Sequence, residues 1–428
     1  MPNRATNGGG AGPPPQLRPG HDAAWLGVPV VSWALYDLAN TVFSMNITTL
    51  YLPQWLLEVG GGDGVWGYVN SFAALLLLLT APVLSALSDQ AGRRLPFLLV
   101  CTAACVGLTA LLGTWGVAAT LGLYVGANYF FNAGLIFYDA TLPVVSTPEN
   151  RGRVGGFGIG IGYLGSFTGV LTGILLLDSL GYVGVFRVTA LLFALFAVPI
   201  FIFVREPAVG RRLRLTLDLP RRAFRQARDT FVHVRRYPGL ARFLVGRVFY
   251  ADAANTVIIM LVFYLRGDLG MSTGTTDLLM MVAITGAVAG GLVTGRIVDR
   301  IGPKRTLMGV LGLWVVGLSA AIAVSVLDLP AALFWAIAPL IGVALGGTWT
   351  ADRPWMLELS PPDRVGEFYG LYGLVGRFAA VLGPALWALI ADTLGFGRPA
   401  ALASLIVLIG IAAWILSGVP DRPREAAL

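Results

Sequence analysis

The sequence predicts an all-α integral membrane protein with about twelve transmembrane helices, arranged as two pseudo-symmetric six-helix bundles. The chain of 428 residues is 56% hydrophobic and only 12% charged, with a mean hydropathy of +0.75, so it has too few charged groups to cover a soluble globule of its size. Apolar runs of membrane-crossing length follow one another along the chain. Polar patterns recur about half a chain length apart, which indicates two copies of one unit.

Short polar or charged stretches divide the chain into five parts. Residues 1–27 are rich in Gly and Pro and contain no apolar run of a signal peptide, so we expect a disordered cytoplasmic tail. The other parts are an N-terminal six-helix bundle at 28–204, a basic cytoplasmic linker at 205–240, a C-terminal six-helix bundle at 241–418 and a cytoplasmic tail at 419–428. The spans are expected at about 28–57, 64–88, 95–115, 118–145, 154–178, 182–204, 241–266, 274–299, 304–327, 330–358, 366–393 and 397–418.

Arginine and lysine residues fall in every second loop, whereas the alternate loops carry acidic residues. By the positive-inside rule, both termini and the linker should be cytoplasmic, in a multi-pass protein of the plasma membrane. The Arg-rich linker suits an amphipathic helix that lies on anionic lipid headgroups, with Phe224 and Phe231 at the acyl boundary. A solvated linker that only sets the orientation is the alternative. The net charge of +7 does not indicate nucleic acid as a partner, because the basic residues lie between apolar segments and not on one face.

The pattern Asp-x-Ala-Asn-Thr occurs twice inside apolar runs, at 37–41 and at 252–256. An ionisable side chain inside a span is energetically costly unless it faces protein or water, so Asp37 and Asp252 are candidate functional residues. The alternative is that each carboxylate only ties helices together. An unpaired buried carboxylate favours its protonated form, so proton binding at these residues is a second expectation.

Two loop patterns also recur: residues 85–94 read SALSDQAGRR and residues 295–304 read GRIVDRIGPK. The second resembles the loop motif of the major facilitator superfamily, and the first resembles a degraded copy with Ser85 in place of Gly. Four segments resemble, more narrowly, the branch that includes the fungal vacuolar amino-acid effluxers and related bacterial permeases. They are WALYDLANTVF (33–43), GFGIGIGYLG (156–165), RVFYADAANTV (247–257) and GEFYGLYGLVGRFAAVLGP (366–384).

The resemblance implies that spans one, four, seven and ten line a central cavity. The residues expected to bind substrate or protons there are Asp37, Asn40, Asp139, Asp252, Asn255 and Asp352, with the aromatic Tyr36, Tyr138, Tyr250 and Trp349. Their counter-charges would be Arg247, Arg353 and Arg377. If every acid is permanently paired, these groups are structural ion pairs and not a proton path.

The resemblance also implies that the two loop aspartates latch one half of the protein to the other. Asp89 would accept hydrogen bonds at a helix that begins near Gly366, and Asp299 at a helix that begins near Gly155. Simple turn-capping is the alternative. The expected gating residues are Asp89, Gly92, Arg93, Arg94, Asp299, Arg300, Gly302, Lys304 and Glu367.

Residues 160–165 spell the dinucleotide pattern G-x-G-x-x-G, but no strand precedes them and no acidic residue follows at the required distance, so we expect no nucleotide cofactor. Glycines recur at every fourth position at 165–173 and 286–290, which lets helix backbones approach closely in lipid. We interpret these stripes as a sliding interface between the two halves. Cys101 and Cys105 lack partners at ligand spacing, so neither a metal site nor a disulfide is expected.

These features favour a secondary transporter, not an enzyme, that moves a small polar solute by alternating access. An amino acid or similar zwitterion suits Asn40 and Asn255, because each amide both donates and accepts hydrogen bonds. A proton gradient that acts through Asp37 or Asp252 would drive transport, or the protein is a facilitator. Two alternatives stay open: an efflux pump for amphipathic or cationic compounds, whose apolar part the aromatic lining would hold, and a non-transporting membrane receptor or scaffold.

Overall fold

The structure is a computed structural model that describes residues 26–147, 150–206, 219–361 and 365–420, and all regular structure within these residues is helical. The N-terminal half contains α1 (Val28–Phe43), η1 (Ser44–Leu50), α2 (Tyr51–Glu58), α3 (Asp63–Ala91), α4 (Leu95–Ala110), α5 (Val117–Asp139), α6 (Leu142–Val145) and α7 (Arg151–Phe203). Helix α8 (Leu219–Val234) follows. The C-terminal half contains α9 (Pro238–Phe263), η2 (Tyr264–Asp268), α10 (Thr273–Ile301), α11 (Pro303–Val326), η3 (Ala331–Leu333), α12 (Phe334–Leu359), α13 (Val365–Phe378), α14 (Leu382–Ala388), η4 (Leu389–Thr393) and α15 (Gly397–Ser417).

The described helices account for the twelve crossings that the sequence predicts. Among the residues that the structure describes, eight helical stretches are long and apolar enough to span a membrane. Helix α7 comprises two crossings, because its backbone leaves the helical conformation at Gly181. Gly181 has φ 64° and ψ 178°, a conformation that residues other than glycine rarely adopt. The remaining crossings are α4, α5 and the continuous path through α1, η1 and α2, which is wound as a π-helix at Ser44–Leu50.

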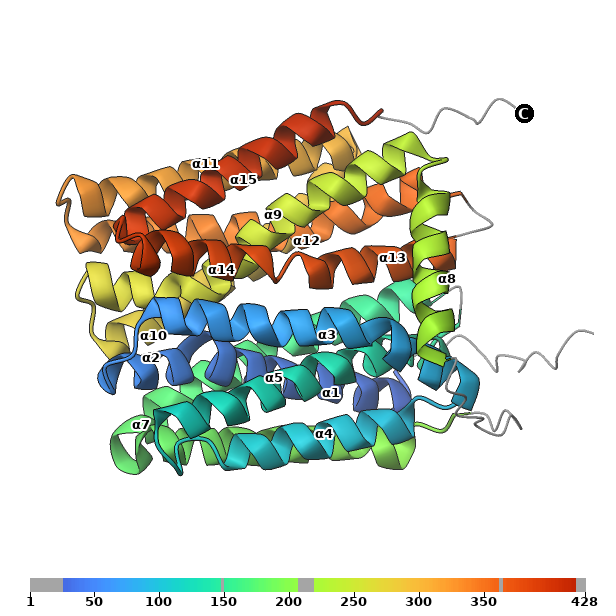
Figure 1. The fold of residues 1–428 in the computed structure, drawn as a ribbon, viewed down its shortest axis with the longest axis horizontal. Helices are drawn as coiled ribbons and strands as arrows, with labels where there is room; N and C mark the ends of the chain where they lie inside the picture. The colour runs from blue at the N-terminus through green and yellow to red at the C-terminus, as the bar shows by residue number, and fades with distance from the viewer. Residues whose placement is uncertain (1–25, 148–149, 207–218, 362–364, 421–428) are drawn as a thin grey trace, which may run out of the picture.

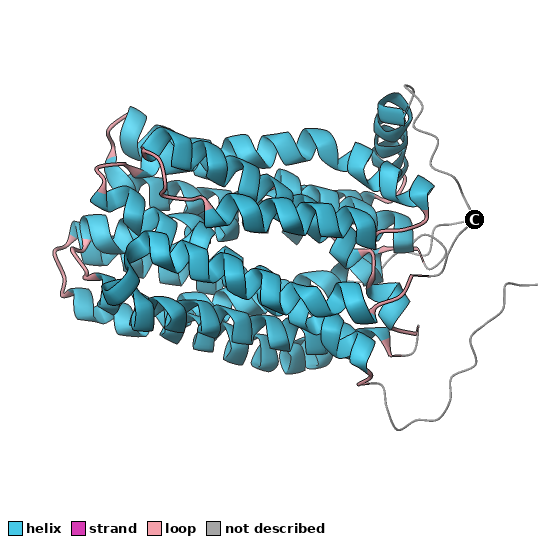
Figure 2. Cartoon of the chain, turned by 90° about the horizontal axis from the view of Figure 1, so that it is seen from below, coloured by secondary structure: helices cyan, strands magenta, loops and turns pink. Residues whose placement is uncertain are grey.

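The two halves lie side by side with their long helices running in the same general direction. In Figure 1, α1 to α7 form the lower, blue-to-green half, and α9 to α15 form the upper, yellow-to-red half. Figure 2 shows the bundle after a 90° turn, with the loops that join successive crossings at its two ends. One crossing is interrupted within the bundle, by the turn between α13 and α14. Helix α8 crosses one end, which we call the basic end. The opposite end, with α2, η2 and η4, is called the far end.

The outer surface of the bundle is apolar. Large side chains such as Leu191, Leu195 and Trp414 are 66%, 61% and 78% exposed, respectively. Such a surface is stable only when lipid covers it, so the protein is a multi-pass integral membrane protein. The fold class predicted from the sequence is confirmed by this arrangement.

Helices α7 and α10 contact each other across the two halves, as expected of an interface there. The glycine stripes, however, pack helices within each half, so the expectation that they form this interface is wrong. A Cβ atom on Gly169 of α7 would lie 2.6 Å from Oδ1 of Asn46, in the first crossing of the same half. A Cβ atom on Gly290 of α10 would lie 2.5 Å from Cα of Val343 in α12. The spacing correctly indicates close helix contact, but it does not specify which helix is the partner.

Candidate functional site

Asp37 lies at the contact between α1 and α7. Its side chain is partly buried, and a Cβ atom on Gly162 would lie 2.5 Å from its Oδ2 atom. Thr41 Oγ1 donates a hydrogen bond to the backbone carbonyl of Asp37 at 2.9 Å. A larger residue at position 162 would therefore displace the Asp37 carboxylate. No described residue donates a hydrogen bond to that carboxylate.

Asp252 occupies the equivalent place in the C-terminal half, but its carboxylate is held more firmly. Thr256 Oγ1 donates to the carbonyl of Asp252 at 2.7 Å, as Thr41 does to Asp37. The backbone N–H of Gly383 donates to Asp252 Oδ1 at 2.9 Å, and Asp252 is only 2% exposed. The repeated motif thus places each aspartate against a glycine of a neighbouring helix. Of these two carboxylates, that of Asp252 accepts a hydrogen bond from a described residue and that of Asp37 does not.

The two asparagines of the repeated motif, Asn40 and Asn255, differ in burial. Asn40 is buried, and its Nδ2 atom has no hydrogen-bond partner among the described residues. Asn255 is partly buried. A buried amide N–H without a partner is energetically unfavourable, so Asn40 is a donor that a ligand or water would satisfy.

Asp352 forms an ion pair with Arg247 inside the C-terminal half. Tyr372 donates to Asp352 Oδ1 at 2.9 Å and Tyr250 to Oδ2 at 3.3 Å, and the carboxylate is completely buried. The Arg247 guanidinium carbon lies 3.6 Å from the ring centroid of Tyr372 and 5.6 Å from that of Trp349. This cluster joins α9, α12 and α13. The two charges are paired with each other, which is the arrangement of a structural ion pair, although Nε of Arg247 has no hydrogen-bond partner among the described residues.

Four other charged residues, two from each half, lie within electrostatic range of members of the opposite half. Asp37 and Asp139 come from the N-terminal half, and Arg353 and Arg377 come from the C-terminal half. Asp139 and Arg353 are within electrostatic range of Asp37, and both arginines are within electrostatic range of Asp139. Arg353 is also within electrostatic range of Tyr163 in α7. Tyr163 was not identified from the sequence as a candidate site residue. We call Asp37, Asp139, Arg353 and Arg377 the inter-half charge cluster.

Tyr36 and Tyr138 belong to the packed core of the N-terminal half. The Tyr36 hydroxyl is 2.7 Å from Thr102 Oγ1, and the Tyr138 hydroxyl donates to the carbonyl of Trp33 at 3.1 Å. The two tyrosine rings stack with centroids 5.0 Å apart, and both residues are buried. They support α1 and α5, on which Asp37 and Asp139 lie.

The expected gating residues lie at the basic end. The side chains of Asp89 and Glu367 are outside the described part of the structure. Gly92 and Gly302 have φ of 63° and 86° and end α3 and α10, as expected of glycines in tight turns. The remaining side chains are half-buried Arg94 and Lys304 and exposed Arg93, Asp299 and Arg300. The proposed latch between the halves stays a prediction.

Polar contacts between the halves cluster at the far end, where the sequence indicated only loop acids. Arg398 contacts Asp63 at 3.1 and 3.2 Å, and it also donates to Asp268 at 2.7 Å. Trp387 Nε1 donates to Asp63 Oδ2 at 2.9 Å. Asp63 starts α3 of the N-terminal half, whereas the other three residues belong to the C-terminal half.

A second set of far-end contacts surrounds Glu58 and Asp277. Tyr182 donates to Glu58 at 2.7 Å, and Arg266 lies 3.6 Å from the same carboxylate. Tyr51 Oη and Gln54 Nε2 of α2 each lie 3.2 Å from the Asp277 carboxylate of α10. These two sets of contacts are called the far-end lock. They hold the halves together at the end opposite to α8.

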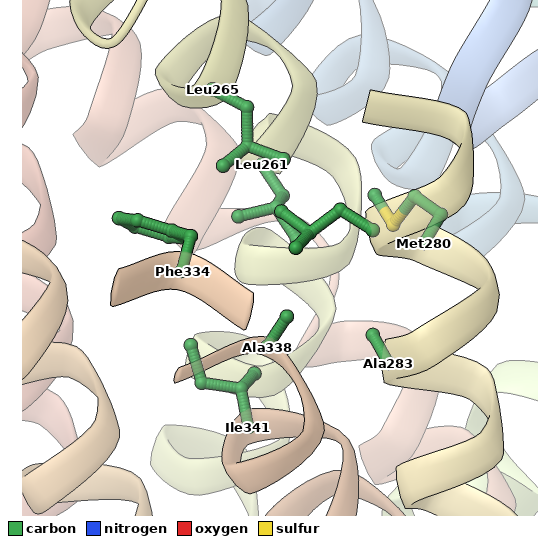
Figure 3. Close-up of a pocket in the computed structure, with 8 residues that line it drawn as sticks. Leu261, Leu265, Met280, Ala283, Phe334, Ala338 and Ile341 are labelled. Atoms are coloured by element: carbon green, nitrogen blue, oxygen red, sulfur yellow. The ribbon is translucent and has the colours of Figure 1, made fainter. Parts of the chain in front are cut away.

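The pocket drawn in Figure 3 lies within the C-terminal half, between α9, η2, α10 and α12. It is lined by Leu261, Leu265, Leu279, Met280, Ala283, Phe334, Ala338 and Ile341. This lining offers no polar side chain to a solute, so it does not compete with the inter-half charge cluster as a polar binding site. Among the described residues, no group of three His, Cys, Asp or Glu side chains is placed to hold a metal ion.

Sequence comparisons place the chain among known transporters. A family model described as "Vacuole effluxer Atg22 like" matches residues 63–425. An uncharacterized MFS-type transporter of Bacillus subtilis, YxiO, is 28% identical over 91% of this chain and 94% of that protein. The multidrug resistance protein MdtG of Serratia proteamaculans is 24% identical over 93% of this chain and 96% of that protein. Autophagy-related protein 22-1 of Neosartorya fischeri is 24% identical over 69% of this chain and 53% of that protein.

Solved structures share the fold. A bacterial homolog of the human lysosomal transporter Spinster superposes with a TM-score of 0.67 at 16% identity, covering 92% of this chain and 97% of that chain. The nucleoside transporter NupG superposes with a TM-score of 0.70 at 10% identity, covering 92% and 99%. With twelve crossings in two halves and a family match over most of its length, the chain is a membrane transporter of the major facilitator type and belongs to the vacuole effluxer Atg22-like family.

Proposed function

We propose that the protein moves a zwitterionic solute of amino-acid size by alternating access, with the inter-half charge cluster as its binding site. The observation that supports this proposal is the division of charge: both acids come from one half and both arginines come from the other. An ammonium group would bind at Asp37 and Asp139, and a carboxylate would bind at the arginine side. A solute with both groups would therefore bridge the halves.

Such bridging gives the solute a means of changing the conformation. A ligand shifts an equilibrium only by its differential affinity for the two states. The solute contacts both halves only when the charge cluster is brought together, so its binding favours closure near the basic end. Closure there would be accompanied by opening of the far-end lock as the halves rock. A proton gradient acting through a carboxylate is the proposed drive.

The test compares three molecules that differ by one charged group: an amino acid, the amine without its carboxylate and the acid without its amino group. Only the zwitterion is expected to raise the melting temperature of the purified protein and to show flux in proteoliposomes, because a ligand that binds only the native state stabilises that state. Equal binding and flux of the amine alone would contradict the proposal. That result would favour the second candidate below.

Export of amphipathic or cationic compounds is the second candidate. The name of the MdtG relative, a multidrug resistance protein, supports it, and so does the effluxer description of the family. The two arginines of the charge cluster argue against a simple cation, because they would repel it. A panel of lipophilic cations in the same proteoliposomes separates the candidates.

We also propose that the basic end is cytoplasmic and that α8 rests on anionic lipid headgroups of the plasma membrane. Helix α8 crosses the bundle axis, and its exposed side chains include Phe224, Arg225 and Arg228. A helix with apolar and basic side chains in this position is attracted to an anionic bilayer surface. Phe231, expected at the acyl boundary, has a side chain outside the described part.

The lipid contact predicts a change in hydrogen exchange. The α8 amides are expected to exchange more slowly in nanodiscs that contain phosphatidylglycerol than in nanodiscs of phosphatidylcholine alone. An Arg225→Gln/Arg228→Gln variant should lose most of this difference in exchange rate. Each arginine near an anionic surface contributes about 1 kcal/mol of attraction, and the variant lacks two. Amides of α11, away from the bilayer surface charge, are the internal control. Equal exchange of α8 in both lipids would rule out the headgroup contact.

A further inference from the structure

Asp277 is a buried acid of the C-terminal half whose hydrogen-bond partners come from the N-terminal half. It lies about one turn into α10 from the far end and is 2% exposed. Tyr51 and Gln54 of α2 contact its two carboxyl oxygens at 3.2 Å each. We infer that Asp277 is a proton-binding site that must be protonated for the two halves to close at the far end.

The count of available hydrogens supports a protonated Asp277. Tyr51 Oη lies 2.9 Å from the carbonyl oxygen of Val170, which can only accept a hydrogen bond. A phenol has one O–H, and the shorter contact with Val170 uses it. The contact between Tyr51 Oη and Asp277 Oδ2 then needs a hydrogen from Asp277 itself. Gln54 Nε2 donates to the other oxygen, Oδ1, which serves as the carbonyl of a carboxylic acid.

No nearby positive charge among the described residues is placed to neutralise an ionised Asp277 carboxylate. Arg266 of η2 is within electrostatic range, but its guanidinium contacts Glu58 at 3.6 Å and Tyr182 Oη at 3.5 Å. No described basic residue forms an ion pair with Asp277. An ionised carboxylate at this place would be buried with two neutral partners, an unfavourable arrangement. A neutral acid is satisfied by the same two partners.

Opening of the far end would separate Asp277 from both partners, because they belong to the other half. The exposed acid would then release its proton to water on the far side, leaving a carboxylate. Closing again would require the carboxylate to regain a proton from that side. This inference rests on the alternating access proposed above, and it adds a proton step to the far-side half of the cycle. It also places that step away from the solute-binding acids.

The Asp277→Asn variant isolates the protonated form. Its side-chain amide donates to Tyr51 Oη and accepts from Gln54, as the neutral acid does. Spin labels at Val59→Cys and Leu394→Cys, both exposed at the far end of opposite halves, report the closed and open populations. Between acidic and alkaline pH, the wild-type closed-to-open ratio is expected to fall by up to about tenfold per pH unit. Asp277→Asn should stay closed throughout.

Asp328→Asn is the matched control, because Asp328 is an exposed far-end acid whose backbone conformation, φ 50°, asparagine tolerates. It should behave as wild type. An infrared band of a protonated carboxyl group that is present in wild type and lost in Asp277→Asn gives a second readout without any solute. An unchanged infrared band, or a wild-type label distance independent of pH, would overturn the assignment. Neither readout depends on the zwitterion test, so the two proposals fail separately.

Discussion

Oxidation of the Gly64→Cys/Asp392→Cys double variant is expected to abolish solute flux, and reductant is expected to restore it. Gly64 lies in the first turn of α3 in the N-terminal half, and Asp392 lies in η4 of the C-terminal half. A Cβ atom on Gly64 would be 2.8 Å from the Cβ of Asp392. A disulfide needs about 3.5–4.5 Å between these atoms, so a small backbone adjustment at two helix ends suffices.

The expected block is complete because the far end must open once in every cycle of alternating access. Cys101 and Cys105 are free but buried, so they are not expected to form disulfides with the two introduced cysteines. The Gly64→Cys single variant, oxidised in the same way, should keep its flux. Transport at the wild-type rate by the double variant, with the disulfide verified by mass spectrometry, would show that the far end need not open.

The fold could be predicted from the sequence because membrane insertion leaves few choices. A run of about 20 apolar residues must be helical in lipid, since every backbone polar group has to be satisfied within its own segment. The division of α7 into two crossings was also predicted, at 154–178 and 182–204, and Gly181 with its positive φ lies between them. The glycine spacing likewise predicted that α7 and α10 each pack closely against a neighbouring helix. The partner helices were not, because spacing along one helix carries no information about the neighbouring helix.

The site was predicted only in part, because ion pairs join residues far apart in the chain. The cost of burying a charge singles out Asp37, Asp252 and Asp352 in the sequence. It does not reveal that Asp352 is paired with Arg247, 105 positions away, whereas Asp37 lacks a hydrogen-bond donor. The far-end lock was missed for a related reason. Asp63 lies at the start of a span, where a linear reading takes an acid for a loop charge.

Two of the three arginines expected as counter-charges, Arg377 and Arg247, should respond in opposite ways to mutation. Arg377→Gln is expected to lower flux at least about tenfold, because losing one charge-assisted contact to a solute amounts to about 1.5–3 kcal/mol. Its melting temperature should change little, since no described residue forms an ion pair with Arg377. Arg377→Lys, which keeps the charge but not the planar fork, should fall between Arg377→Gln and wild type.

Arg247→Gln is expected to lower the melting temperature strongly instead, because it leaves the Asp352 carboxylate buried without its cation. Breaking a buried pair on one side destabilises by about 3–5 kcal/mol, whereas replacing both ions by apolar residues of similar volume is often neutral. Arg247→Met/Asp352→Leu should therefore recover most of the melting temperature. Thermal unfolding and flux, measured on the same preparations, separate the two arginines. If Arg377→Gln lowered the melting temperature as much as Arg247→Gln, Arg377 would also be structural, and the charge division that supports the binding site would lose its cationic side.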